Sequence, residues 1–211
     1  NSDFVDLSII AKDNEIPFLK TKDINSKIVL DWASDLEPDI IFCLGWPQLI
    51  KKDLLSLPDK YVIGYHPSDL PFNRGRHPLI WAMVLGLTQT ASSFFVMDEG
   101  ADTGRVISKR SVEISENDKA MDLYENIEST ARVQIIELVK MIKSNQVETI
   151  QSNASGNSWR KRSEKDGEID WRMTAMSIQN LIRALSEPYD GAHFCFNSKK
   201  YKVFDSELSK R

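Results

Sequence analysis

The residues with the greatest potential for chemistry lie in the stretch from Tyr61 to Arg105. It holds two of the three histidines, His66 and His77, three of the eight prolines, and a glycine-bounded acidic loop that contains Asp102. A histidine beside a carboxylate can transfer protons or stabilise a developing charge. We interpret this stretch as an active site and the rest of the chain as the frame that positions it.

His66 and Asp102 are the candidate catalytic residues. His66 ends a predicted buried strand over 61–65, and in open α/β sheets ligands bind at the carboxyl ends of strands. Asp102 lies between Gly100 and Gly104, which permit a close approach of the backbone to a ligand. Each residue also has an ordinary interpretation, because a lone histidine is more often structural and an aspartate in a turn often only shapes it.

Other polar residues of this stretch have weaker claims. Arg74 and Arg76 lie in a glycine-containing loop and could hold a phosphate or a carboxylate, although a solvated loop explains them equally well. His77 precedes Pro78 at a predicted helix start, which is consistent with a packing or capping role. The chain contains no Walker loop, G-x-G-x-x-G, HExxH or G-x-S-x-G motif.

The pattern of apolar residues predicts an α/β fold. Short apolar runs at 40–44 and 61–65 flank a short helix, which is typical of a βαβ unit with parallel strands. Further strands are predicted at 90–97 and 105–114, joined by a tight loop. A long amphipathic helix then extends to about Lys143.

The composition changes at residue 151 and predicts two parts, a catalytic domain over 1–150 and a small C-terminal part over 151–211. Residues 151–167 are polar and rich in Gly, Ser and Asn, as in a linker or a lid. Thr174 is the predicted cap of an amphipathic helix, and 192–205 has the pattern of a β-hairpin.

The overall composition argues against several classes of protein. A net charge of −4 and a pI of about 5.5 argue against a nucleic-acid surface. Cys43 and Cys195 are too few and too far apart to indicate a disulfide framework or a metal site. The chain has no apolar run that could span a bilayer and no visible signal peptide, so we expect a cytoplasmic protein with no membrane partner and no metal.

Four motifs resemble those of a known family. They are G-Y-H-P-S-D-L-P at 64–71, R-G-R-H-P at 74–78, M-D-E-G-A-D-T-G at 97–104 and D-G-E-I-D-W at 166–171. In this combination and spacing they resemble the formyltransferases that use N10-formyltetrahydrofolate, most closely the sugar N-formyltransferases.

The resemblance implies a Rossmann-like, mostly parallel sheet with flanking helices, followed by a small C-terminal helix and a β-hairpin. It also implies that His66 and Asp102 act as an acid/base pair on a tetrahedral intermediate. The residues implied to contact the folate are Gly45, Trp46, Pro47, Gln48, Leu49, Ile50, Asp98, Glu99, Gly100 and Ala101. The candidates for substrate contacts are Ser68, Asn73, Arg74 and Arg76. The family begins with a β-α-β unit that is not found before Asn1, so we expect an N-terminal piece to be missing.

One position departs from the family pattern. Gly64 stands where the family has a catalytic Asn whose side chain helps to stabilise the oxyanion. Loss of one such donor typically lowers the rate by about 10²–10³-fold. Either another donor replaces it (a backbone N–H, Asn73 or a water) or the chain is not catalytic. We expect replacement, because the surrounding motifs are intact.

The expected substrate is a nucleotide-linked amino sugar, as in polysaccharide biosynthesis. The short C-terminal part is not strikingly basic and would hold tRNA poorly, and glycinamide ribonucleotide enzymes lack the D-G-x-I-D-W segment. The sequence is also compatible with a methionyl-tRNA formyltransferase-like enzyme, a formyl hydrolase, or a non-catalytic protein that binds folate or a sugar nucleotide. A homodimer is a further expectation.

Overall fold

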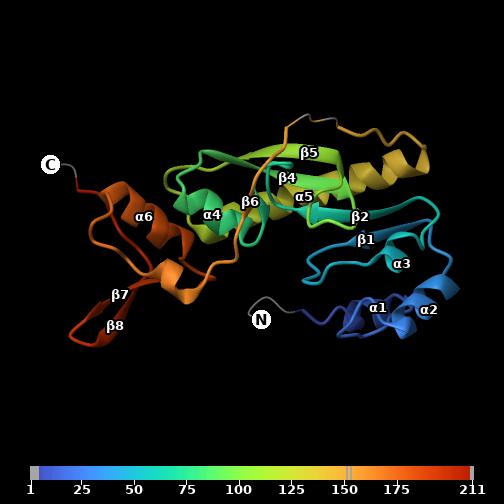
Figure 1. The fold of residues 1–211 in the computed structure, drawn as a ribbon, viewed down its shortest axis with the longest axis horizontal. Coiled ribbons are helices and arrows are strands. Elements are labelled where there is room, and N and C mark those ends of the chain that lie inside the picture. Colours follow the sequence, from blue (N-terminus) through green and yellow to red (C-terminus); the bar gives the residue numbers. More distant parts are fainter. Residues whose placement is uncertain (1–4, 151, 153, 210–211) are drawn as a thin grey trace.

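A four-stranded sheet lies at the centre of the molecule, with strands in the order β1-β2-β4-β5 (Figure 1). The computed structural model describes residues 5–150, 152 and 154–209. The strands of this sheet are β1 (Ile40–Cys43), β2 (Tyr61–His66), β4 (Gln89–Val96) and β5 (Arg105–Glu113). All four strands were predicted to within a residue or two, and the α/β class is confirmed.

The pairing of these strands differs from the expected mostly parallel sheet. β1 and β2 are parallel, as predicted, but β4 is antiparallel to both β2 and β5. A parallel pair needs a long crossover connection, and the 97–104 loop between β4 and β5 is too short to provide one. In the described residues the sheet is therefore mixed, with its one parallel pair at the β1 edge.

Helices cover both faces of the sheet. The long helix α5 (Ala120–Lys143) packs on one face, where Leu138 lies in a buried cluster with Ile63 of β2. On the opposite face, α2 (Lys27–Asp35) and α3 (Lys52–Leu55) pack around Val62. Because side chains alternate along a strand, positions 64 and 66 face the same side as Val62. β2 therefore directs His66 away from α5.

The remaining elements flank this sheet. The N-terminal helix is α1 (Ser8–Asp13), and the loop after β2 contains the short strand β3 (Arg74–Gly75) and leads into α4 (Pro78–Val84). The C-terminal part consists of β6 (Ser158–Trp159), the 3-10 helix η1 (Glu164–Gly167), α6 (Ala175–Ala184), β7 (Ala192–Phe196) and β8 (Lys199–Val203). No helix among the described residues is long and apolar enough to cross a membrane.

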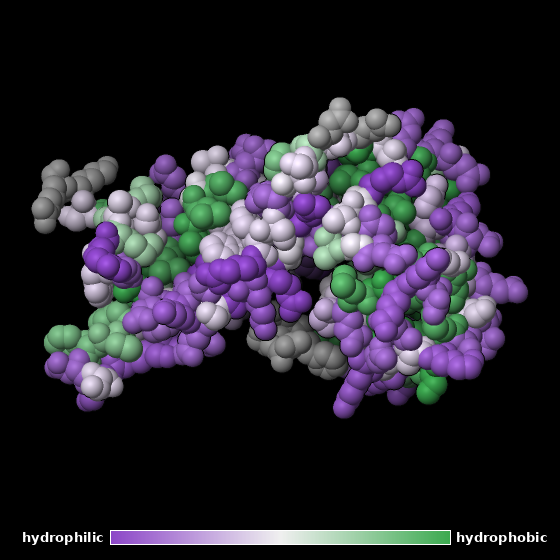
Figure 2. Space-filling view, in the orientation of Figure 1, coloured by the Kyte–Doolittle hydropathy of each residue, from purple (hydrophilic) through white to green (hydrophobic). Residues whose placement is uncertain are grey.

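The helix and the hairpin of the C-terminal part form as the sequence predicted. Thr174 caps α6, since its side-chain oxygen accepts a hydrogen bond from the Ser177 N–H at 3.1 Å. β7 and β8 form the predicted antiparallel hairpin. This hairpin projects from the body of the molecule at the lower left of Figure 1, and Figure 2 shows apolar and polar side chains mixed along it.

Part of the predicted linker pairs with the main body of the protein. After α5 the chain crosses back over the molecule, and β6 pairs in parallel with β3, Arg74 opposite Ser158 and Gly75 opposite Trp159 (Figure 1). We call residues 154–160 the strap. Gly75 has φ +98°, and a Cβ built there would lie 2.2 Å from the Trp159 carbonyl oxygen. Only glycine allows the strap to approach the loop this closely.

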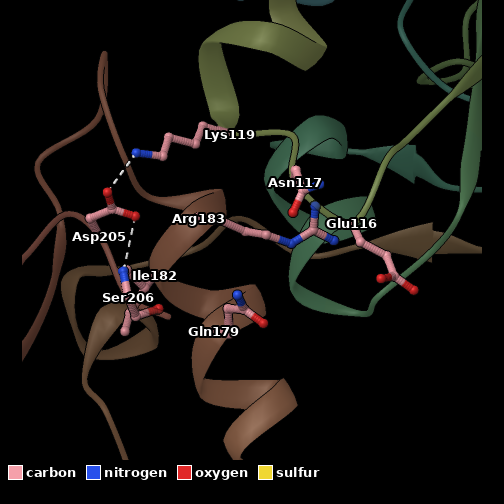
Figure 3. A pocket seen from close by; sticks show the side chains of 8 residues that line it. All are labelled: Glu116, Asn117, Lys119, Gln179, Ile182, Arg183, Asp205 and Ser206. Atoms are coloured by element: carbon pink, nitrogen blue, oxygen red, sulfur yellow. Dashed lines mark hydrogen bonds and ion pairs between the residues drawn. The ribbon is translucent and has the colours of Figure 1, made fainter. Parts of the chain in front are cut away.

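A polar pocket of about 200 Å³ marks a second contact between the C-terminal part and the main body. Figure 3 shows Arg183 reaching from α6 toward Glu116 and Asn117, and Lys119 paired with Asp205. The Arg183 Nη1 donates to the carbonyls of Ser115 at 2.9 Å and Asp118 at 3.1 Å. The cations of this pocket therefore already have partners, and its lining contains no histidine.

Replacing Arg183 tests how much this contact contributes to the stability of the protein. We expect Arg183→Met to lower the free energy of unfolding by about 1.5–3 kcal/mol, because two carbonyls lose a charged donor. The matched control is Arg172→Met, whose side chain is 90% exposed and pairs only with nearby Asp170. That variant should change stability by less than about 1 kcal/mol. Urea unfolding measures both, and equal effects would contradict the expectation.

Candidate active site

His66 and Asp102 meet, as their motifs predicted. The Nδ1 of His66 lies 3.7 Å from Oδ1 of Asp102, and their side chains are 9% and 22% exposed. β2 delivers the histidine at its last residue, and the loop between β4 and β5 delivers the aspartate. The backbone N–H of Gly75 holds the second carboxylate oxygen, Oδ2, at 3.2 Å. The pair is thus a nearly buried imidazole and a carboxylate anchored by a backbone donor.

The protonation state of His66 follows from its neighbours. Its Nε2 lies 3.3 Å from the carbonyl oxygen of Asn73, and a carbonyl only accepts hydrogen bonds, so Nε2 carries the proton. Burial lowers the pKa of His66, and this effect exceeds the opposing effects of Asp102 and of the Asn73 carbonyl. Near neutral pH the ring is therefore neutral, with an Nε2–H donor and an Nδ1 acceptor facing Asp102.

The loop that carries Asp102 is closed by its first acidic residue. Oδ1 of Asp98 accepts hydrogen bonds from the Gly100 N–H at 2.9 Å and from the Thr103 hydroxyl at 2.6 Å. Asp102 itself has φ +57°, a left-handed conformation that Asp tolerates better than most residues. Asp98 thus shapes the turn that points Asp102 at His66, so these two aspartates have separate tasks.

The space beside Gly64 is filled by apolar side chains. A Cβ built on Gly64 would lie 2.7 Å from Cζ of Phe95 and 2.9 Å from Cγ of Met97. Phe95 is only 2% exposed and packs with Leu70 and Val106. The position that holds a polar side chain in the family pattern is therefore closed by carbon atoms. A water in this space has too few polar partners to be stable, which leaves Asn73 and backbone N–H groups as replacement donors.

An open pocket of about 520 Å³ adjoins this position, since Met97 lines it as well. Of the predicted folate residues, Asp98, Glu99 and Gly100 line the pocket and Ala101 does not. The opposite wall comes from the helix α3 and the residue after it, Lys52, Leu55 and Ser56. Sequence patterns did not point to these three residues, because α3 has the composition of an ordinary surface helix.

The other predicted folate segment, Gly45 to Ile50, follows β1 but does not line this pocket. Gln48 joins it to the 22–25 loop, accepting from the Ile24 N–H at 3.2 Å and donating to the Lys22 carbonyl at 3.1 Å. Trp46 and Leu49 are exposed, whereas Ile50 is buried in the cluster around Val62. The exposed part of the turn remains accessible to a ligand.

The four predicted substrate contacts have different surroundings. Ser68 is completely buried, and its hydroxyl donates to the Phe72 carbonyl at 3.0 Å. Arg74 donates to the strap, from Nη2 to the Ser155 carbonyl at 3.2 Å. Asn73 is half-buried and adjoins the catalytic pair through its carbonyl. Arg76 is exposed, and its guanidinium has no hydrogen-bond partner among the described residues.

His77 connects the loop to the segment after the strap. Its Nδ1 accepts a hydrogen bond from the Arg162 N–H at 3.2 Å, so the folded structure needs this nitrogen unprotonated. Burial lowers the pKa of His77, and the neighbouring cations Arg76, Arg162 and Lys161 lower it further. His77 therefore has a structural role, in line with the packing or capping expected of a residue at a helix start.

The lowered pKa values of His66 and His77 predict a loss of stability in mild acid. Below the ordinary histidine value of 6.5 the unfolded chain binds protons that the folded chain does not, so stability falls as pH falls. We expect a smaller free energy of unfolding at about pH 5.5 than at about pH 7.5. In His77→Gln, which can still accept from the Arg162 N–H, the difference should shrink. An unchanged difference in that variant would contradict a role for His77.

Within the described residues, no group of three His, Cys, Asp or Glu side chains could hold a metal ion. The residues that sequence patterns missed lie mainly in the strap. Asn157 is the clearest of them, since it contacts the loop that holds His66. No sequence motif marks it, because it lies in a run of Ser, Asn and Gly that resembles any flexible linker.

Comparison with known proteins agrees with this geometry. Residues 8–139 match the family described as Formyl transferase, and residues 161–211 match its C-terminal domain. The bifunctional polymyxin resistance protein ArnA of Wigglesworthia glossinidia brevipalpis is 33% identical over 197 residues. That alignment covers 93% of this chain but only 30% of the length of ArnA.

Solved structures share the fold. A 4-N formyltransferase from Francisella tularensis superposes with a TM-score of 0.77 at 24% identity, over 97% of this chain and 83% of that one. The N-formyltransferase from Helicobacter canadensis, solved with folinic acid and dTDP-3-aminofucose, gives a TM-score of 0.78 at 23% identity, over 97% and 72%. Methionyl-tRNA formyltransferase from Clostridium thermocellum gives 0.71 at 19% identity, over 96% and 87%. The family match over most of the chain confirms the resemblance inferred from the motifs: this chain belongs to the formyl transferase family.

Proposed function

We propose that this protein transfers a formyl group from N10-formyltetrahydrofolate to the amine of a nucleotide-linked amino sugar. The observation that carries the proposal is the contact between His66, at the end of β2, and Asp102, in the loop whose residues Asp98, Glu99 and Gly100 line an open pocket. The family membership supports formyl transfer. The Helicobacter relative, solved with folinic acid and dTDP-3-aminofucose, supports the choice of co-substrate and acceptor.

In the proposed reaction the amine nitrogen attacks the formyl carbon and forms a tetrahedral intermediate. Its oxyanion accepts a hydrogen bond from Nε2–H of His66, and the Asn73 carbonyl at 3.3 Å keeps the proton on this nitrogen until the intermediate forms. Asp102, whose carboxylate lies 3.7 Å from Nδ1, is the base that takes the proton lost by the amine. The bond from the carbon to N10 then breaks, and the proton lost by the amine is returned to N10. His66 and Asp102 are the proposed catalytic residues.

The other site residues enter this proposal with different support. The folate would lie against the pocket lined by Asp98, Glu99 and Gly100, with the neighbouring Ala101 and the turn from Gly45 to Ile50 as its further predicted contacts. For the acceptor, Arg76 is the better candidate for the diphosphate, because the guanidinium of Arg74 is occupied by the strap. The domain boundary at 150/151, a homodimer and a cytoplasmic location remain predictions from the sequence.

One observation favours a second candidate function. Phe95 and Met97, rather than a donor, occupy the space beside Gly64, which would suit a protein that binds folate or a sugar nucleotide without turnover. The experiment that tests the proposal must therefore also detect binding alone, transfer to tRNA and hydrolysis of the formyl group.

The test is incubation of the protein with N10-formyltetrahydrofolate and a panel of nucleotide-linked amino sugars, with product masses as the measurement. A product heavier by one formyl group supports the proposal. Formate released without an acceptor indicates a hydrolase. Folate binding with no product on any sugar, or on methionyl-tRNA, indicates a binding protein.

A further inference from the structure

The strap pairs with β3, and the other edge of this segment makes hydrogen bonds to both catalytic side chains. β3 and its flanking residues have two edges. On one edge the Asn73 carbonyl accepts from His66 at 3.3 Å and the Gly75 N–H donates to Asp102 at 3.2 Å. The other edge belongs to the strap, where the Arg76 N–H donates to the Trp159 carbonyl at 3.2 Å. Any shift of the strap therefore moves the groups that orient the catalytic pair.

Asn157 makes the contact nearest to His66. Its side-chain oxygen Oδ1 accepts from the Asn73 N–H at 2.9 Å, and its carbonyl accepts from the Arg74 N–H at 3.1 Å. The peptide group between Asn73 and Arg74 is thus held at its N–H by Asn157 and at its C=O by His66. Asn73 has φ +61°, a left-handed conformation that Asn adopts more readily than most residues.

These bonds form a continuous chain, from the Asn157 backbone carbonyl through one peptide group to the imidazole of His66. Hydrogen bonds in such a chain polarise and strengthen one another. Gly156 lets the strap lie close to the catalytic loop, because a Cβ there would lie 2.0 Å from the Pro71 carbonyl oxygen. The strap is consequently seated on the catalytic loop from Pro71 to Arg76.

We propose that Asn157 is a positioning residue for the reaction, which through the Asn73 carbonyl fixes the ring orientation and tautomer of His66. The inference rests on the proposed function for its kinetic consequence only. The chain segment between the two parts of the protein is then a component of the active site. Displacing the strap would move the Asn73 carbonyl away from Nε2 of His66 and leave the imidazole ring free to rotate.

The first arm of the test reads the histidine ring without any turnover. Ring 15N chemical shifts of the full chain report which nitrogen is protonated, and with three histidines the signals can be assigned by single substitutions. We expect wild-type His66 to show the Nε2–H tautomer. Asn157→Ala should show a mixture of tautomers, and Asn157→Asp, which keeps an acceptor for the Asn73 N–H, should retain the wild-type tautomer.

The second arm measures formyl transfer. Asn157→Ala should lower kcat by about three- to tenfold, the effect of losing one hydrogen bond, with KM for the folate unchanged. Asn157→Asp should restore most of the rate. Ser155→Ala is the matched control, because the strap uses only the carbonyl of Ser155. Thermal unfolding of each variant checks that it is folded.

The outcomes separate this inference from the proposed function. A wild-type tautomer and kcat in Asn157→Ala would overturn the positioning role. A loss of rate that Asn157→Asp does not rescue, with the tautomer unchanged, would also overturn it. If Asn157→Ala changes the tautomer but the wild-type protein transfers no formyl group, the proposed function is overturned. The inference that Asn157 orients His66 is then supported.

Discussion

His66→Ala and Asp102→Asn should each lower kcat for formyl transfer by about 10²–10⁴-fold, the range expected for loss of a positioned acid/base group. His66→Ala removes the imidazole whose Nε2–H lies at the end of β2. Asp102→Asn keeps an oxygen for the Gly75 N–H but loses the charge that favours a proton on His66. Its pH–rate profile should therefore shift as well, because the pKa of His66 falls further.

The matched control for this prediction is Asp69→Asn. Asp69 lies three residues from His66 and pairs with Lys109 at 2.7 Å, on a side chain that is 49% exposed. Removing this carboxylate tests whether any nearby charge matters, and we expect activity within about twofold of wild type, as for an exposed ion pair. Rates are compared in steady state on the acceptor that supports turnover. Transfer that survives both His66→Ala and Asp102→Asn would remove the pair from the mechanism.

Much of this site could be predicted because its elements carry local signals. The apolar runs of β1 and β2 are continuous, and the loop between β4 and β5 that carries Asp102 is bounded by glycines. Outside the site, Thr174 marks the start of α6 in the same way. The contact between His66 and Asp102 came from motifs whose spacing is specific to the family, since neither residue was decisive alone. The geometry supports that contact at 3.7 Å.

The remaining features depend on contacts between segments distant in the chain, which local patterns do not encode. The strap reads as a linker, because the pairing of β6 with β3 uses backbone groups that any residue possesses. The mixed sheet was missed because β4 is buried on both faces, a pattern of burial that is typical of parallel strands. The effect of Gly64 depends on Phe95, which lies opposite it on β4 and 31 positions along the chain.

Gly64→Asn, which restores the family residue, should destabilise the protein and fail to raise its activity. The new side chain would have to displace Phe95 or Met97, whose atoms lie within 3.0 Å of the Cβ position. Overpacking of this kind costs about 1–3 kcal/mol. Gly45→Asn is the matched control for stability, because it introduces the same residue at a glycine with open space and a left-handed φ of +68° that Asn tolerates.

A double-mutant cycle then tests whether overpacking against Phe95 causes the loss of stability in Gly64→Asn. Phe95→Ala leaves a cavity and should itself cost about 3–5 kcal/mol, but combined with Gly64→Asn the cost should be less than the sum, since each change relieves the other. Urea unfolding gives the four free energies, and formyl transfer is measured on the same samples. An additive cycle, or a Gly64→Asn protein of wild-type stability that transfers faster, would mean that the space beside Gly64 accepts a polar side chain. The oxyanion donor would then belong at position 64, as in the family pattern, rather than at Asn73 or the backbone.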